Sequence, residues 1–420
     1  MRVLLISANT ERISMPTVPV GLAYVASATR RAGHEVVLLD LMFESAPLTA
    51  VRQRITDLTP DAIGISVRNI DDQSYQAPRF LLEQVRPVIA ECRLSSSAPI
   101  ILGGAGYSLF PDAALQYLQA DMGIEGDGET IFPLLLERLS THTDLSNLPG
   151  VHIAGQSASV PPLFSDNLNV CEFPYREICS CADPRRNDIW VPVQSRRGCP
   201  NNCSYCATFR IQGRKIRSCS PQIIADGIGR LVEAGYHQFY FVDNSFNIPE
   251  SHALALCRAL RALNAELEWR CIIYPEQVTE ELASEMASSG CEEVALGFES
   301  GNEIVLRQFN KRFSPENVRR TSDLFSGHGI RRTGFLLFGG PGETRLSVEE
   351  SLAFAESLHL NTLRITVGIR LYPHTPLALR AVHEGVIEAN DNLLFPRFYL
   401  APGLEPWIFD RVTPGIHPLA

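Results

Sequence analysis

The sequence contains no apolar run that could cross a membrane. None of its 420 residues falls in a stretch of about 18 consecutive apolar residues, which a membrane-spanning helix requires. The apolar start, Met1–Ser7, is too short for the core of a signal peptide and is better explained as a first buried strand. We therefore expect a cytoplasmic protein without a membrane span.

Positive charge is also scarce. The chain has 37 Lys and Arg against 47 Asp and Glu, and its net charge of −10 argues against a nucleic-acid partner. The 11 cysteines are odd in number and follow no export signal, so reduced thiols are expected rather than a disulfide scaffold. Hydrophobic residues at 45% and charged residues at 20% exclude a disordered chain, and the length predicts two to three domains.

Short apolar strands alternate with helices over residues 1–140. This alternation predicts an α/β fold with a doubly wound parallel sheet, covered by helices on both faces. In such sheets ligands bind outside the carboxyl ends of the strands, so the residues just after each strand are candidates for binding. Strands are expected at 3–7, 35–39, 62–66, 99–102 and 122–124, and helices at 19–32, 79–92, 113–118 and 131–139.

Two of the loops after these strands are rich in glycine, Gly103–Ser108 and Glu125–Glu129. Glycine lets a phosphate or a large flat ligand approach the backbone closely. Tight strand-to-helix turns explain the same glycines equally well, and their spacing does not match the dinucleotide-binding fingerprint.

Residues 141–188 have many prolines and weak periodicity, which predicts a linker. Cys171, Cys179 and Cys181 lie in this segment. They lack the histidine partners or paired CxxC units that a zinc site requires, so free thiols are the favoured interpretation.

The strongest signal is Arg197-Gly-Cys-Pro-Asn-Asn-Cys-Ser-Tyr-Cys206. Three residues separate Cys199 from Cys203, and two separate Cys203 from Cys206. Three thiolates on one tight loop can hold three irons of a four-iron cluster and leave the fourth iron open. An open coordination position is typical of catalytic metal sites. The alternatives are a zinc site without its fourth ligand and three unrelated thiols.

At these residues the chain resembles the radical SAM superfamily, and the aromatic Tyr205 is part of the match. The resemblance implies a [4Fe-4S] cluster on Cys199, Cys203 and Cys206, with S-adenosyl-L-methionine (SAM) on the open iron. Reductive cleavage of SAM would give a 5′-deoxyadenosyl radical, and Tyr205 would flank the adenine.

The segment after the cysteines supports this resemblance. Further strands are expected at 239–243, 293–298, 334–338 and 363–370, with helices at 222–233, 252–263 and 315–325. The alternation suits the partial, TIM-like (β/α)6 barrel of the superfamily over residues 189–385. By resemblance, the SAM-binding residues are those that follow these strands: Asp243, Asn244, Glu299, Ser300, Gly339 and Gly340. Asp243 stands where the family often has a Gly-Gly-Glu stretch, and its carboxylate could accept from the SAM ammonium.

A doubly wound domain directly before such a barrel resembles the cobalamin (B12)-binding radical SAM group. The resemblance implies a Rossmann-like cobalamin domain over residues 1–140. Its expected cobalamin contacts are Ser66, Arg68, Asn69, Gly103, Gly104, Tyr107, Ser108, Gly126 and Glu129. The Asp-x-His-x-x-Gly signature is absent around Asp40–Phe43, so no protein histidine is expected on cobalt. A domain that has kept its shape and lost the ligand is the alternative.

This group implies methylation of an unactivated carbon through a substrate radical and methylcobalamin, with a second SAM restoring the methyl group. The expected substrate is a small metabolite, a natural-product intermediate or a lipid, and the electron donor a flavodoxin or ferredoxin. The alternatives are a radical SAM enzyme of non-methylating rearrangement, cyclisation or redox chemistry, and a cobalamin-binding sensor or carrier. Residues 386–420 form a tail rich in proline and aromatic residues. Packing of these aromatics on the barrel is the favoured interpretation, and the alternative is a tail that folds over the barrel mouth and helps to shape the substrate pocket.

Overall fold

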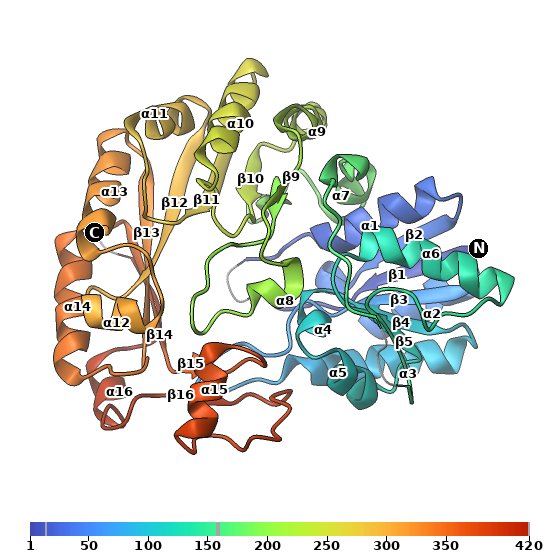
Figure 1. The fold of residues 1–420 in the computed structure, drawn as a ribbon. Coiled ribbons are helices and arrows are strands. Elements are labelled where there is room, and N and C mark those ends of the chain that lie inside the picture. The colour runs from blue at the N-terminus through green and yellow to red at the C-terminus, as the bar shows by residue number, and fades with distance from the viewer. Residues whose placement is uncertain (13–14, 157–159, 419–420) are drawn as a thin grey trace.

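The computed structural model describes residues 1–12, 15–156 and 160–418. Two α/β units lie side by side, and the C-terminal segment with helix α15 (Pro376–His383) runs along the lower edge where they meet (Figure 1). No helix within these ranges combines the length and the apolar character needed to cross a membrane.

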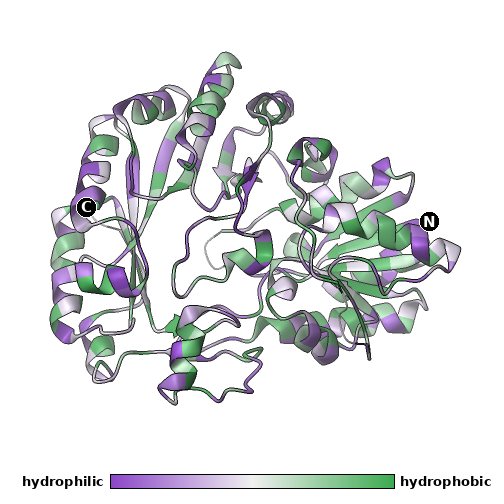
Figure 2. Cartoon of the chain, in the orientation of Figure 1, coloured by the Kyte–Doolittle hydropathy of each residue, from purple (hydrophilic) through white to green (hydrophobic). Residues whose placement is uncertain are grey.

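The N-terminal unit is built on a six-stranded sheet in the order β2-β1-β3-β4-β5-β6. All neighbouring strands are parallel except β6, which runs antiparallel to β5. The strands are β1 (Arg2–Ser7), β2 (Glu35–Asp40), β3 (Ala62–Ser66), β4 (Ile100–Gly103), β5 (Met122–Ile124) and β6 (Val151–Ile153). Their near-continuous apolar sequence matches burial on both faces (Figure 2).

Helices cover both faces of this sheet, so the expected doubly wound fold is confirmed. One face packs against α1 (Val20–Arg31) and α6 (Gly128–Thr141), and the other against α2 (Pro47–Leu58), α3 (Val85–Ser95) and α5 (Pro111–Leu118). Two helices that we did not predict are α2 and the short α4 (Ala105–Leu109).

The C-terminal unit is a partial barrel of six parallel strands that follow one another in chain order. They are β7 (Val191–Val193), β10 (Gln238–Phe241), β11 (Glu268–Ile273), β12 (Cys291–Glu299), β13 (Arg331–Phe338) and β14 (Thr362–Val367). A short antiparallel strand, β17 (Gly415–Pro418), pairs with β14 at the edge. The (β/α)6 expectation is therefore confirmed, with β11 as a strand that we did not predict.

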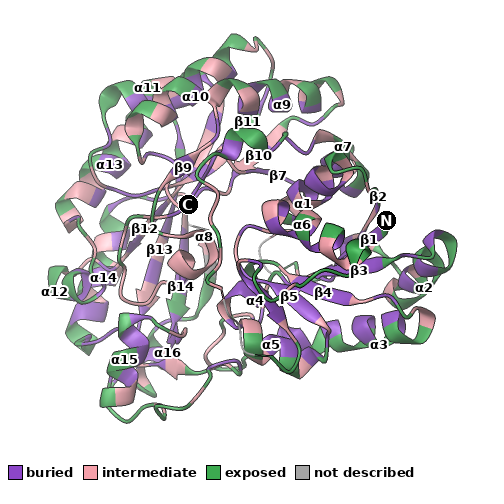
Figure 3. Ribbon diagram, turned by 45° about the vertical axis from the view of Figure 1, so that its right-hand side comes forward, coloured by how far each residue is buried: buried purple, intermediate pink, exposed green. Residues whose placement is uncertain are grey.

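Helices wrap the outer face of the barrel, and its strands are largely buried (Figure 3). These helices are α9 (Pro221–Glu233), α10 (Glu250–Ala262), α11 (Glu280–Ser288), α13 (Pro315–Gly327) and α14 (Arg345–Ser357). The remaining short elements are η1 (Leu41–Phe43), η2 (Leu81–Gln84), η3 (Leu168–Val170), α7 (Tyr175–Cys181), β8 (Arg196–Arg197), α8 (Thr208–Gln212), β9 (Arg217–Ser218), α12 (Glu303–Gln308), β15 (Ile369–Arg370), β16 (Phe398–Tyr399) and α16 (Trp407–Arg411).

One of the hydrophobic clusters spans both units. Ile369, Leu371 and Tyr399, which follow the barrel strands in sequence, belong to the same buried cluster as the α2/α3 face of the first sheet. The C-terminal tail also contacts both units, since Phe395 stacks 4.7 Å from the ring of Phe80. The tail thus packs on the barrel, through β17 and β14, and also on the first unit.

Candidate functional site

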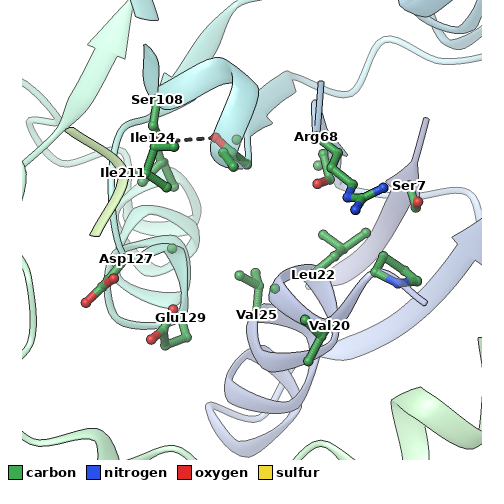
Figure 4. Close-up of a pocket in the computed structure, with 18 of the residues that line it drawn as sticks. Ser7, Val20, Leu22, Val25, Arg68, Ser108, Ile124, Asp127, Glu129 and Ile211 are labelled. Carbon is green, nitrogen blue, oxygen red and sulfur yellow. Dashed lines mark hydrogen bonds between the residues drawn. The ribbon is translucent and has the colours of Figure 1, made fainter. Parts of the chain in front are cut away.

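A cavity of about 310 Å³ opens at the carboxyl edge of the first sheet. Apolar side chains of α1, among them Leu22 and Val25, form one wall, and α6 forms another (Figure 4). The barrel closes it with Gln194, Arg197 and Gln212. The cavity therefore lies at the ligand-binding edge of a doubly wound sheet and also borders the second unit.

Seven of the nine predicted cobalamin contacts line this cavity: Ser66, Arg68, Gly103, Gly104, Ser108, Gly126 and Glu129. Arg68 extends into it near Ser7 (Figure 4) and has no ion pair or hydrogen bond with any described residue. Ser108 joins the two glycine loops, because its hydroxyl accepts from the Gly126 amide at 3.1 Å and donates to the Gly104 carbonyl at 3.0 Å. No histidine is among the described lining residues.

The other two predicted contacts lie elsewhere. Tyr107 is fully buried in the core, and its ring fills the space beside Gly123, where a Cβ would lie 2.1 Å from it. Asn69 lines a small neighbouring pocket instead. Gly104 supports the turn interpretation, since it has a φ of +101° and a Cβ there would lie 2.6 Å from the Val67 carbonyl oxygen.

The cysteine loop begins at Gly198, whose φ of +88° and close approach to the Lys215 carbonyl (2.0 Å from a Cβ) exclude any side chain. Backbone hydrogen bonds hold the loop to the rest of the barrel, for example from Ser204 to the Phe309 carbonyl at 3.0 Å. All three cysteines are free and half-buried. Among the described residues, no three His, Cys, Asp or Glu side chains converge on one point as a single metal ion would require. A cubic cluster makes no such demand, because each thiolate binds a different iron.

The electrostatics of the loop depend on Lys311, one of only two lysines in the sequence. Burial raises the pKa of Cys203 to about 11, and the Lys311 ammonium opposes this shift. Its Nζ donates to a Glu299 carboxylate oxygen at 3.1 Å and lies 5.5 Å from the ring centroid of Tyr205. The Tyr205 hydroxyl donates to the same Glu299 oxygen at 2.9 Å. A cation beside the thiols is the electrostatic environment that a thiolate-bound cluster needs.

Two family profiles match this chain. The profile described as "Radical SAM superfamily" matches residues 193–355, and the one described as "B12 binding domain" matches residues 6–136. The chain is a B12-binding radical SAM protein.

Relatives of this radical SAM protein extend over most of its length. An uncharacterised methyltransferase of Pyrococcus horikoshii is 24% identical over 92% of this chain and 84% of the relative. The tryptophan 2-C-methyltransferase of Streptomyces laurentii is 22% identical over 88% of this chain and 73% of the relative. The solved radical SAM methyltransferase TsrM of Kitasatospora setae, with cobalamin and a [4Fe-4S] cluster bound, shares the fold, with a TM-score of 0.84 at 22% identity over 97% of this chain and 85% of that one.

Within the radical SAM barrel, the predicted SAM-binding residues Tyr205 and Glu299 lie in contact. Glu299 ends β12 with a φ of +66°, a strained conformation of the kind that often marks functional sites. Asn244 lies next to the cysteine loop, since its amide donates to the Gln212 side chain at 2.7 Å and to the Gly198 carbonyl at 3.4 Å.

Asp243 and Ser300, both predicted SAM contacts, are engaged by other parts of the protein, and their role in SAM binding stays a prediction. The Asp243 carboxylate is buried and accepts from the backbone amides of Ser195 and Arg196, at 2.8 and 3.0 Å, and from the Ser195 hydroxyl. It therefore ties the end of β10 to the connection between β7 and β8, and its second oxygen also lies 3.5 Å from Nε of the buried Arg196. Ser300 is also fully buried and shares a hydrogen bond of 2.9 Å with Ser351 of α14, away from the cysteine loop.

Gly339 and Gly340 form a tight turn after β13. Both amides donate to the buried carboxylate of Glu343, at 2.5 and 3.0 Å. A Cβ on Gly340 would lie 2.5 Å from the Phe309 ring, so this glycine is required by packing. Burial raises the pKa of Glu343 to about 7. The turn places the two glycines without leaving their amides free for a ligand.

Glu129 has a partner that the sequence did not reveal. It lines the cavity, yet its carboxylate pairs with Arg197 of the barrel. Cys171 of the linker segment donates to the same carboxylate at 3.7 Å. Cys171, Cys179 and Cys181 are free thiols in the structure.

Proposed function

We propose that this protein is a cobalamin-dependent radical SAM enzyme that methylates a carbon of a small molecule. The observation that carries the proposal is the contact between its two sites. Arg197 lines the cavity of the B12-binding domain and stands two positions before the first cysteine of the radical SAM motif. Cofactors bound at the two sites would thus face a common space, as a transfer between them requires. Methylation is supported by the three relatives named above, since all three are named methyltransferases.

In this proposal Cys199, Cys203 and Cys206 hold the [4Fe-4S] cluster, and the cavity holds cobalamin without a histidine on cobalt. When bound, these groups and SAM supply the 5′-deoxyadenosyl radical and the methyl group, and an electron donor such as flavodoxin or ferredoxin supplies the electron. The chain's own residues bind and orient them. Lys311 and Glu299 fix the Tyr205 ring beside the cysteine loop. Arg68 extends a positive charge into the cavity, whereas Arg197, the other arginine that lines it, pairs with Glu129 and Asp127.

Four arginines stand near strand ends and could face an anionic substrate or the SAM carboxylate, namely Arg331, Arg332, Arg364 and Arg370. Two of them do not fit that role. Arg370 is buried and pairs with Asp71 at 2.8 Å. Arg332 is also buried, and its guanidinium donates to the carbonyl of His359 at 3.0 Å. The proposed substrate class therefore rests on the relatives and not on a cationic substrate pocket.

The proposal is tested by anaerobic reconstitution with iron, sulfide and hydroxocobalamin, followed by quantification of all three on one sample. We expect one four-iron cluster and one corrin per chain, together with 5′-deoxyadenosine when SAM and a low-potential reductant are added. Cleavage of SAM by a protein that retains no corrin would reject the methyltransferase and leave a radical SAM enzyme of other chemistry. Corrin binding without any SAM cleavage would indicate a sensor or carrier.

A further inference from the structure

Four buried charged side chains meet where the two units touch. Arg197 of β8 donates to Glu129 of α6 and lies 3.2 Å from an Asp127 oxygen. Arg217 of β9 donates to the other Asp127 oxygen at 2.5 Å. All four side chains are at least nine-tenths buried. Two acids come from the B12-binding domain and two arginines from the barrel, so the charges balance across the boundary.

Each member of the pair Arg197–Glu129 belongs to a loop proposed to bind a cofactor. Glu129 stands in the first turn of α6, where the helix dipole also favours its negative charge, and it forms part of the cavity wall. Arg197 is separated from Cys199 only by Gly198. The backbone at Gly198 is tightly packed against Lys215, so a shift of Arg197 is passed on to the cysteine instead of being absorbed between them.

The surroundings hold the Arg197 guanidinium in one orientation. Its Nε donates to the Gln194 side chain at 2.8 Å, and its plane lies 5.5 Å from the ring centroid of Tyr24. A buried ion pair contributes little net stability relative to apolar residues, but removing one partner leaves the other charge uncompensated. Such a pair is best explained by the geometry that it enforces.

We propose that Arg197 and Glu129 form a positioning pair that fixes the cluster-binding loop relative to the cobalamin cavity. This inference rests on the proposed function, because it assigns to the pair the spacing of the two cofactors. Glu129 acts through Arg197, and Asp127 with Arg217 provides a second, parallel link. The pair transfers no group and carries no proton in the reaction.

The test uses Glu129→Gln, which keeps the shape of the side chain and removes its charge. Lys215→Gln is the matched control, because it breaks the exposed ion pair with Asp166 next to the same hairpin. In cluster-loaded protein without corrin, we expect backbone amides of residues 198–206 to exchange hydrogen for deuterium about tenfold faster in E129Q than in wild type. The control should match wild type.

A second readout uses both cofactors. In wild type loaded with cob(II)alamin and a reduced cluster, we expect a dipolar interaction between the two paramagnetic centres in electron paramagnetic resonance. In E129Q molecules that carry both cofactors, we expect a broader distribution of that interaction. Unaltered exchange of residues 198–206 in E129Q would overturn the proposal.

Wild-type protein that binds no corrin would contradict the proposed function instead, and the exchange result alone would then decide the role of the pair. If E129Q does not fold, Arg197→Lys decides by the same exchange measurement. It keeps the charge but loses the planar fork, so faster exchange is again expected and wild-type exchange would overturn the proposal.

Discussion

At the scale of single residues, Cys203 stands between two opposing influences. Burial raises its pKa to about 11 and so disfavours the thiolate, whereas the buried Lys311 ammonium favours it. Lys311 is held by Glu299 and by the face of Tyr205. The loop therefore favours thiolates when a metal group binds them. It does not favour a free thiolate in the absence of that group.

The first prediction concerns this loop. Cys203→Ala should lose the four-iron cluster and reductive SAM cleavage, by at least about 100-fold in rate, because it removes one of three iron ligands. Iron and sulfide content, the visible absorption of the cluster and release of 5′-deoxyadenosine measure this. Cys179→Ala, a half-exposed cysteine on α7, should behave as wild type. A C203A protein that cleaves SAM normally would remove the basis of the cluster assignment.

At the residue scale, the sequence is most informative where the chemistry is local. The spacing of Cys199, Cys203 and Cys206 is contained in eight positions, and Tyr205 and Glu299 do meet beside them. It is least informative where the direction of a side chain decides. Asp243 and Tyr107 stand near strand ends, but their side chains turn into the protein. Lys311 was missed because no local pattern marks a lysine that folds back onto a distant loop.

At the scale of elements, the cysteine loop depends on the hairpin of β8 and β9. Gly198→Ala would place a Cβ 2.0 Å from the Lys215 carbonyl. We predict a severalfold loss of cluster content after reconstitution, measured as iron per chain. Gly329→Ala is the control, because Gly329 also has a positive φ, +73°, but nothing lies within 4 Å of its Cβ. If both variants lose cluster to the same extent, the positive φ that the two glycines share explains the loss. The close contact between Gly198 and Lys215 would then not be its cause.

The turn after β13 gives a prediction about pH. Burial raises the pKa of Glu343 from its ordinary 4.5 to about 7. The folded state then binds this proton more tightly than the unfolded state, so the carboxyl destabilises the fold as pH rises from 4.5 towards 7. Between pH 5 and pH 8, Glu343→Gln should gain about 2 kcal/mol in unfolding free energy relative to wild type. Urea unfolding of both proteins measures this, and a constant difference between them would contradict the shift.

Elements with strong apolar runs were predictable, and those with mixed surfaces were not. Strands β1, β3 and β4 are buried almost throughout, and their apolar runs predicted them from the sequence. Strand β11 alternates exposed or half-buried Glu268 and Arg270 with buried Trp269 and Cys271, so it lacked the continuous apolar run that marked the others. Helix α2 buries only Val51, Ile55 and Leu58, too few to stand out from a polar loop.

At the scale of the whole molecule, the two units behave as one body because they share a core and buried ion pairs. The loop after β3 reaches the end of the barrel, where Asp71 pairs with Arg370 and both side chains are only 2% exposed. Tyr75 of the same loop stacks 5.5 Å from the ring centroid of Phe409 in the tail and packs on Gly368. We call these contacts of Asp71 and Tyr75 the second interdomain contact, the first being the Arg197–Glu129 pair. Together they hold the cavity and the cysteine loop from two sides.

Breaking the Asp71–Arg370 ion pair of the second interdomain contact should therefore destabilise both units together. Asp71→Asn leaves the buried Arg370 charge without its partner, and we predict a loss of about 3 kcal/mol in unfolding free energy within a single transition. Arg397→Gln removes an exposed ion pair of the tail with Asp391 and should change stability by less than about 1 kcal/mol. Two separate unfolding transitions in either protein would contradict the shared core.

The order of the domains was predictable from sequence, whereas the contacts between them were not. Each domain has its own local signature, the strand–helix alternation or the cysteine motif. The contacts between the domains pair residues far apart in the chain, such as Asp71 with Arg370, and no periodicity in the sequence indicates such a pair.

The most direct test of the account follows the methyl group of SAM. Protein loaded with the cluster and cob(I)alamin is mixed anaerobically with SAM that carries a deuterated methyl group. The account predicts that the label moves to the bound corrin with one equivalent of S-adenosylhomocysteine released. Bound corrin that never acquires the label, with SAM consumed only to 5′-deoxyadenosine, would contradict a methyltransferase.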